Sequence, residues 1–176
     1  MLASPDQTVL LIIDMQCKLM SVIEDHVNVL GQCIRLAKIA QQLGIPIIGT
    51  EENPASLGEN HPELKDLCQK TVTKFHFDGC SDGLTSHIPT DRKQLVLVGC
   101  EAHVCLMQTA LGLLEHGYAV SIAVDAIGSR QSLDKTIATL RLKESGATLK
   151  TVEMLAFEWL KTCKHPGFKN ALALIK

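Results

Sequence analysis

The chain of 176 residues has few aromatic side chains and no long apolar run. Phe, Tyr and Trp make up 3% of it, which leaves little surface for the base stacking that binds single-stranded nucleic acids. No stretch approaches the roughly 20 apolar residues of a membrane-spanning helix. The formal net charge is −2, without a block of like charges. Composition therefore favours neither a nucleic acid nor a membrane as partner.

Several cofactor and nucleophile motifs are also missing. The sequence has no glycine-rich dinucleotide turn, no Gly-Lys-Ser phosphate loop and no Gly-x-Ser-x-Gly elbow. After the first predicted strand, where a dinucleotide turn would lie, it reads Asp14-Met-Gln-Cys17. These absences weigh against a nucleotide cofactor and a serine nucleophile, and we expect no cofactor.

The seven cysteines are odd in number and lack the paired spacing of a disulfide framework or a zinc site. Free thiols of this kind are typical of a reducing compartment. The first thirty residues contain one basic residue, Lys18, and no basic segment followed by an apolar run. We therefore expect no signal or transit peptide, and a cytoplasmic protein.

Strand and helix patterns alternate along the chain. Strands are predicted at 9–13, 47–50, 72–74, 95–98, 118–124 and 147–152, and helices at 25–43, 62–67, 105–117 and 132–145, with two short helices at the end, the second opening near Pro166. Asp125–Gly128 is predicted to be a loop. Such alternation implies right-handed crossovers and a mostly parallel sheet with helices on both faces. With no linker or repeat, residues 1–176 are expected to form one domain.

Cys105 is predicted in the first turn of a helix, just beyond the apolar strand Gln94–Gly99. Open α/β sheets bind their ligands at the carboxyl ends of strands. A helix N-terminus offers free N–H groups to an anion and lowers the pKa of a thiol. The sequence therefore predicts a reactive thiol at Cys105, with a pKa below its ordinary value.

Two further strand ends carry polar residues that should reach the same edge. Asp14 ends the first strand and Lys74 ends the third. A carboxylate that accepts the thiol proton and an ammonium that stabilises both anions would suit attack of Cys105 on an acyl group. Taken singly, Asp14 is as well explained as a turn former, Lys74 as a solvated charge and Cys105 as a small core residue.

Four segments resemble, in order, the isochorismatase-like cysteine hydrolases, and among these the small isochorismatase-domain-containing proteins. They are LLIIDMQ (10–16), GTEENP (49–54), TKFHF (73–77) and VGCEAHVC (98–105). The resemblance runs from Thr8 to about Val152. It implies a three-layer α/β/α Rossmann-like fold and an Asp–Lys–Cys catalytic triad of Asp14, Lys74 and Cys105.

The resemblance also implies a cis peptide bond between Cys100 and Glu101, which would turn a backbone N–H toward an oxyanion beside the N–H of Cys105. Related proteins are commonly dimers or larger, so a homo-oligomer is expected. The amphipathic tail from Pro166 to Lys176 adds modest support, although it would serve equally to cover the sheet of its own subunit.

Substrate contacts are expected from Gln16, Glu52, Phe77 and His103. Three of these have another interpretation: Gln16 as a turn cap, Glu52 as a solvated loop acid, and His103 as a residue at the pocket rim or a subunit contact. Relatives that hydrolyse nicotinamide carry an Asp-x-His metal motif after the second strand. Here that region, 51–61, has one His and no such motif, so we expect no metal site.

Together these patterns predict a hydrolase that cleaves a C–N bond of a small amide-like molecule through a thioester on Cys105. The alternative is a catalytically silent protein on the same fold, with a thiol that binds ligands or responds to redox conditions. A nucleic-acid-acting enzyme is disfavoured by the balance of charge. The substrate itself is not predicted.

Overall fold

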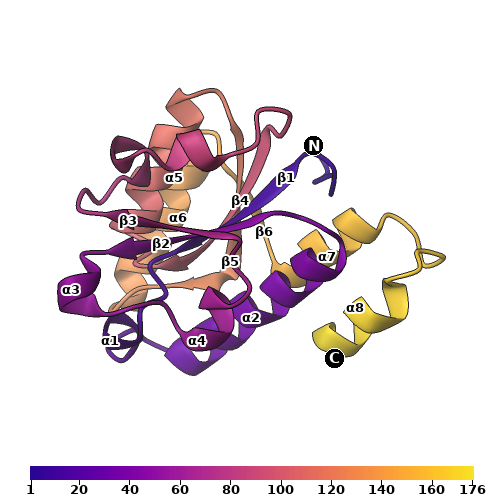
Figure 1. Ribbon diagram of the computed structural model, residues 1–176, viewed down its shortest axis with the longest axis horizontal. Helices are drawn as coiled ribbons and strands as arrows, with labels where there is room; N and C mark the ends of the chain where they lie inside the picture. The colour runs from indigo at the N-terminus through magenta and orange to yellow at the C-terminus, as the bar shows by residue number, and fades with distance from the viewer.

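The computed structural model describes residues 1–176 and is built on one six-stranded sheet (Figure 1). Every strand pairing is parallel, in the order β3-β2-β1-β4-β5-β6. The strands are β1 (Thr8–Ile13), β2 (Ile47–Glu52), β3 (Lys70–Lys74), β4 (Gln94–Cys100), β5 (Ala119–Gly128) and β6 (Thr148–Lys150). The chain winds outward from β1 in one direction and from β4 in the other. The order therefore reverses between β1 and β4, the place where such sheets bind ligands.

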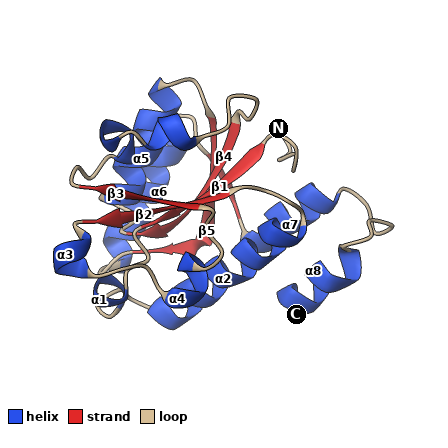
Figure 2. Ribbon diagram, viewed as in Figure 1, coloured by secondary structure: helices blue, strands red, loops and turns tan.

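Helices cover both faces of this sheet, which gives the expected three-layer fold (Figure 2). The helices are α1 (Cys17–Met20), α2 (His26–Gln42), α3 (Pro54–Leu57), α4 (Pro62–Lys65), α5 (Cys105–Glu115), α6 (Ser132–Glu144), α7 (Val152–Leu160) and α8 (Phe168–Ile175), with short 3-10 turns η1 (Gly79–Asp82) and η2 (Leu84–His87). No helix is both long and apolar enough to cross a membrane.

The central strands β1, β2 and β4 are buried on both sides because their side chains alternate between two cores. In β1, Leu10 and Ile12 pack with α2, α7 and α8, whereas Val9, Leu11 and Ile13 pack with α5 and α6. All six residues of β1 are buried. Burial of one such aliphatic side chain stabilises a fold by about 1.5–3 kcal/mol. The apolar runs in the sequence thus fix the two strands whose ends carry Asp14 and Cys105.

Three sequence predictions of element boundaries were wrong. Strand β5 continues through Gly128, so Asp125 lies within the strand. Its carboxylate accepts a hydrogen bond from the N–H of Val152, at 2.9 Å, and so caps the start of α7. Strand β6 ends at Lys150, before that helix, and α8 begins at Phe168, two residues after Pro166.

Candidate active site

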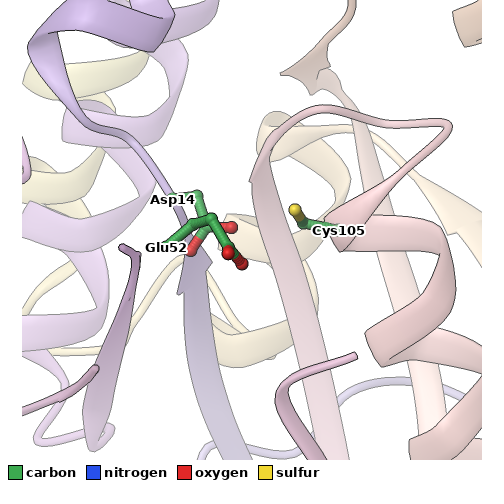
Figure 3. A group of neighbouring side chains, drawn as sticks. All are labelled: Asp14, Glu52 and Cys105. Carbon is green, nitrogen blue, oxygen red and sulfur yellow. The ribbon is translucent and has the colours of Figure 1, made fainter. Parts of the chain in front are cut away.

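Four strands end at the same edge of the sheet, and their last residues or the loops that follow form one polar cluster. Asp14 follows β1, Glu52 ends β2 and Lys74 ends β3. Glu52 and Lys74 are direct partners in the register of β2 and β3. Cys105 opens α5, beyond β4. Carboxylate oxygens of Asp14 and Glu52 and the Sγ of Cys105 all lie within 4.8 Å of one another (Figure 3).

Asp14 is held by Thr50, a residue of the neighbouring strand β2. The Thr50 Oγ1 donates to Asp14 Oδ1 at 2.6 Å and accepts from the backbone N–H of Asp14 at 3.2 Å. Both residues are wholly buried. Asp14 also has a φ of +47°, in the left-handed region that non-glycine residues rarely adopt. A single hydroxyl therefore fixes both the backbone and the carboxylate of Asp14.

Lys74 bridges the two carboxylates. Its Nζ lies 2.8 Å from Asp14 Oδ2 and 2.6 Å from Glu52 Oε2, and it donates to the carbonyl oxygen of His76 at 3.3 Å. The side chain is fully buried. Burial alone would lower the pKa of Lys74, but the nearby Asp14, Cys105 and Glu52 outweigh it, so that this pKa is raised. Lys74 is therefore an ammonium at neutral pH.

The Cys105 thiol is in a different state from the one predicted. The residue is 6% exposed. Burial and the neighbouring Asp14 raise the pKa of the Cys105 thiol to about 12, against the opposing attraction of Lys74. The predicted lowering of this pKa was wrong, because burial and two carboxylates outweigh one ammonium and the helix N-terminus. Cys105 is a neutral thiol at rest, with its Sγ within 4.8 Å of a carboxylate oxygen of Asp14.

We expect this protonated state to appear in alkylation kinetics. The exposed Cys17 and Cys163 should react with iodoacetamide before Cys105 at pH 7.5. Because the thiolate is the nucleophile, the rate at Cys105 should still rise about tenfold per pH unit above pH 9, since its pKa is about 12. Peptide mapping of timed samples measures all three rates. If Cys105 were labelled first at pH 7.5, its pKa would be lowered and not raised.

The backbone at the end of β4 is unusual at Gly99 and at the Cys100–Glu101 peptide bond. Gly99 has a φ of +116°, and a Cβ at this position would lie 2.0 Å from the carbonyl oxygen of Ile13. Only glycine allows β4 to pass so close to β1. The Cys100–Glu101 peptide bond is cis. The backbone N–H groups of Glu101 and Cys105 donate no hydrogen bond within the protein.

The side chains of Cys100 and Glu101 are engaged away from the cluster. Cys100 Sγ lies 3.7 Å from Met20 Sδ in the core beneath α2. Glu101 Oε2 accepts from the backbone N–H and the Nε of Arg130, at 3.0 and 3.1 Å. These two residues can thus contribute to an oxyanion site through their backbone alone.

The remaining residues predicted to contact substrate have different surroundings. Gln16 is fully buried, and its amide bonds the backbone of Glu52 twice, donating to the carbonyl oxygen at 2.9 Å and accepting from the N–H at 2.8 Å. His103 faces α6, with Nδ1 3.0 Å from Ser129 Oγ and Nε2 3.8 Å from Asp134 Oδ2. Phe77 is 52% exposed, in the loop that packs on α5.

A metal ion has three ligand atoms available here, from Asp14, Glu52 and Cys105. The two carboxylates, however, already share the ammonium of Lys74. An ion that took both carboxylates would displace Lys74 and leave its buried charge without a partner, which is costly. The position of Lys74 therefore disfavours a cation at this cluster.

Comparison with known proteins gives a consistent set of relatives. A model of the isochorismatase domain matches residues 8–154. Isochorismatase family protein 1A of Dictyostelium discoideum is 35% identical over 179 residues, covering 97% of this chain and 87% of that protein. Isochorismatase domain-containing protein 2 of Danio rerio is 37% identical over 170 residues, covering 96% and 86%.

Solved structures share the fold along nearly the whole chain. MAR1 ribonuclease from Caenorhabditis elegans superposes with a TM-score of 0.91 and 33% identity, covering 99% of this chain and 92% of that one. YcaC from Escherichia coli, described as an octameric hydrolase of unknown specificity, has a TM-score of 0.88 and 22% identity, covering 99% and 87%. At that identity, the likeness to YcaC concerns the fold alone.

Proposed function

Because the chain belongs to the isochorismatase family, whose fold is that of a hydrolase, we propose that it cleaves a C–N bond of a small amide through a thioester on Cys105. The carrying observation is the cluster at the carboxyl edge of the sheet. It combines a thiol, a carboxylate and an ammonium that bonds this carboxylate at 2.8 Å. These groups suffice for acyl transfer by a cysteine nucleophile. The proposed catalytic residues are Asp14, Lys74 and Cys105.

The first half-reaction transfers the acyl group to the enzyme. Asp14 takes the proton of the Cys105 thiol as Sγ attacks the carbonyl carbon, forming the C–S bond and a tetrahedral oxyanion. The free N–H groups of Glu101 and Cys105 are the donors for this oxyanion. The C–N bond then breaks, and Asp14 returns the proton to the leaving amine. Lys74 offsets the negative charge of the cluster throughout.

The second half-reaction releases the acid. Asp14 accepts a proton from water as the water oxygen attacks the thioester carbonyl carbon. The C–S bond breaks, and the thiolate of Cys105 regains a proton from Asp14. In this proposal Glu52, Phe77 and His103 border the substrate. Gln16 acts indirectly, because its amide holds the backbone of Glu52 in place.

A turnover screen with trapping of the intermediate tests this function. The protein is incubated with a library of small primary and secondary amides at neutral pH, and released ammonia or amine is measured. For each active amide, acid quenching and peptide mapping should find the acyl group on the peptide that contains Cys105. An active amide with the acyl group on another residue, or a library without any turnover, would contradict the proposal and favour the catalytically silent alternative.

A ribonuclease activity is the second candidate, because MAR1 ribonuclease from C. elegans is 33% identical. The charge of this chain offers little to a polyanion, since the net charge is −2 and the cluster holds two carboxylates. Incubation with a fluorescent single-stranded RNA decides between the two. Cleavage by the wild type that Cys105→Ala abolishes would support this second candidate against amide hydrolysis.

We further propose that the chain acts as one domain that assembles with copies of itself. The octameric state of YcaC supports assembly on this fold. Exposed apolar side chains on α6, among them Leu133, Ile137 and Leu140, provide surface that a second copy would cover. Light scattering at micromolar concentration should give a mass at least twice that of the 19.2 kDa chain. A monomer would refute assembly.

A further inference from the structure

The polar cluster contains one carboxylate more than acyl transfer requires. Asp14 and Glu52 both bond the single ammonium of Lys74. With Cys105 a neutral thiol, the cluster has a net charge of −1. Asp14 alone accepts and returns protons in the proposed reaction, so Glu52 is left without a chemical task there.

Glu52 is also the charged member of the cluster that meets solvent. Its side chain is 13% exposed, whereas those of Asp14 and Lys74 are 0% exposed. Oε2 bonds Lys74, and Oε1 accepts no hydrogen bond from the protein. The amide of Gln16 holds the backbone of Glu52, and the hydrogen bond from Lys74 Nζ to Oε2 holds the carboxylate. A substrate that approaches Cys105 therefore meets a fixed, partly free carboxylate.

The positive charge of Lys74 is not available to balance an incoming anion. The Nζ of Lys74 donates hydrogen bonds to Glu52 Oε2 and to the carbonyl oxygen of His76, and it forms an ion pair with Asp14 Oδ2 at 2.8 Å. The side chain is also fully buried. Beyond the turn between β4 and α5, Arg130 bonds Glu101 through its Nε, and its side chain is 59% exposed and not part of the buried cluster. No free cation at the cluster thus awaits a carboxylate or phosphate group.

We propose that Glu52 selects substrates by charge. The site takes amides that are neutral or cationic next to the scissile bond and rejects those with a carboxylate or phosphate there, and the free Oε1 accepts an N–H of the bound amide. This inference concerns the substrates of the proposed hydrolysis and therefore rests on that proposal. The electrostatic selection itself applies to any reagent that reaches Cys105, and so it can be tested without turnover.

The expected effect is a tenfold preference. A unit charge about 4–5 Å from another interacts strongly where the effective dielectric constant is about 20, and partial exposure to water weakens this interaction. Because the Glu52 side chain is 13% exposed, we expect its repulsion of an anionic reagent to lower the rate at Cys105 by about tenfold.

Iodoacetamide and iodoacetate are a suitable pair of probes, because they differ only in an amide against a carboxylate. Each alkylates a thiolate, forming a C–S bond and releasing iodide, and the thiol proton goes to buffer. At pH 8.5, peptide mapping gives the ratio of the two rates at Cys105 and at the exposed Cys17, which serves as internal reference. The amide-to-carboxylate ratio should be at least about tenfold higher at Cys105 than at Cys17.

The variant Glu52→Gln should bring this ratio at Cys105 down by about tenfold. Any change in the thiolate fraction of Cys105 affects both reagents equally and cancels. Glu51→Gln is the matched control, because it removes the same charge one residue away, where Glu51 accepts from the N–H of Asn60. It should leave the ratio unchanged.

Equal ratios at Cys105 and Cys17 in the wild type would overturn the inference, as would an unchanged ratio in Glu52→Gln. Neither result depends on hydrolysis of any amide. Failure of the turnover screen, with the ratios as expected, would instead refute the proposed hydrolysis while leaving the charge selection of the site intact.

Discussion

Replacement of Asp14 by Asn is expected to slow acylation of Cys105 by about 10²–10⁴-fold, the usual scale of general acid–base catalysis. The Asn side chain keeps the shape of the carboxylate and can still accept a hydrogen bond from Thr50 Oγ1. It cannot accept the thiol proton, and the thiol of Cys105 is neutral at rest. Single-turnover kinetics on an amide found in the screen measures the acylation step directly.

The variant Cys105→Ala should differ in kind from Asp14→Asn. Without Sγ there is no covalent route, so turnover should be abolished, while the fold and some affinity for the amide remain. Circular dichroism and thermal unfolding check the fold of both variants. Full activity of Asp14→Asn on an amide that Cys105→Ala cannot hydrolyse would show that another group is the base.

Replacement of Lys74 by Met should have the largest effect on stability. It leaves the carboxylates of Asp14 and Glu52 close together without the ammonium that both contact. Removal of one partner from a buried charge pair costs about 3–5 kcal/mol. Urea unfolding at pH 7 measures this loss in the free energy of unfolding.

Lys65→Met is the matched control for Lys74→Met. Lys65 pairs with Glu59 at 2.6 Å, but its side chain is 36% exposed, and solvent screens such a surface pair so that it contributes little to stability. Because the pKa of Lys74 is raised in the folded protein, its contribution should be present at pH 7–9 and be lost only as the pH rises through that raised value. A loss for Lys74→Met no greater than that for Lys65→Met would show that water reaches and screens the cluster.

The sequence predicted much of the fold because the central strands β1, β2 and β4 are almost entirely buried. Runs such as those in β1 and β4 are apolar throughout, and parallel strands of this kind bring their carboxyl ends to one edge. That geometry is enough to predict that Asp14, Lys74 and Cys105 lie at one edge of the sheet. Asp125 was misjudged, since a lone Asp resembles a turn former when its partner, Val152, is distant in sequence.

Properties that depend on three-dimensional packing could not be predicted from the sequence. Thr50 reads as one more residue of an apolar strand, and only the pairing of β1 with β2 places its hydroxyl on Asp14. Gln16 and Glu52 are 36 positions apart, so their two hydrogen bonds leave no local pattern. The pKa of Cys105 depends on the degree of burial, which spacing along the chain does not reveal.

The neutral thiol of Cys105 has a consequence for survival of the protein under oxidative stress. Peroxide attacks thiolates, and susceptibility follows thiolate character and exposure. A thiol that is 6% exposed and has a pKa of about 12 is a poor target. In the proposed reaction it becomes a nucleophile only when Asp14 accepts its proton. The exposed Cys17 and Cys163 would be oxidised first. The proposed nucleophile is thus a poor target for peroxide at rest, which is the opposite of what a peroxide-sensing cysteine requires.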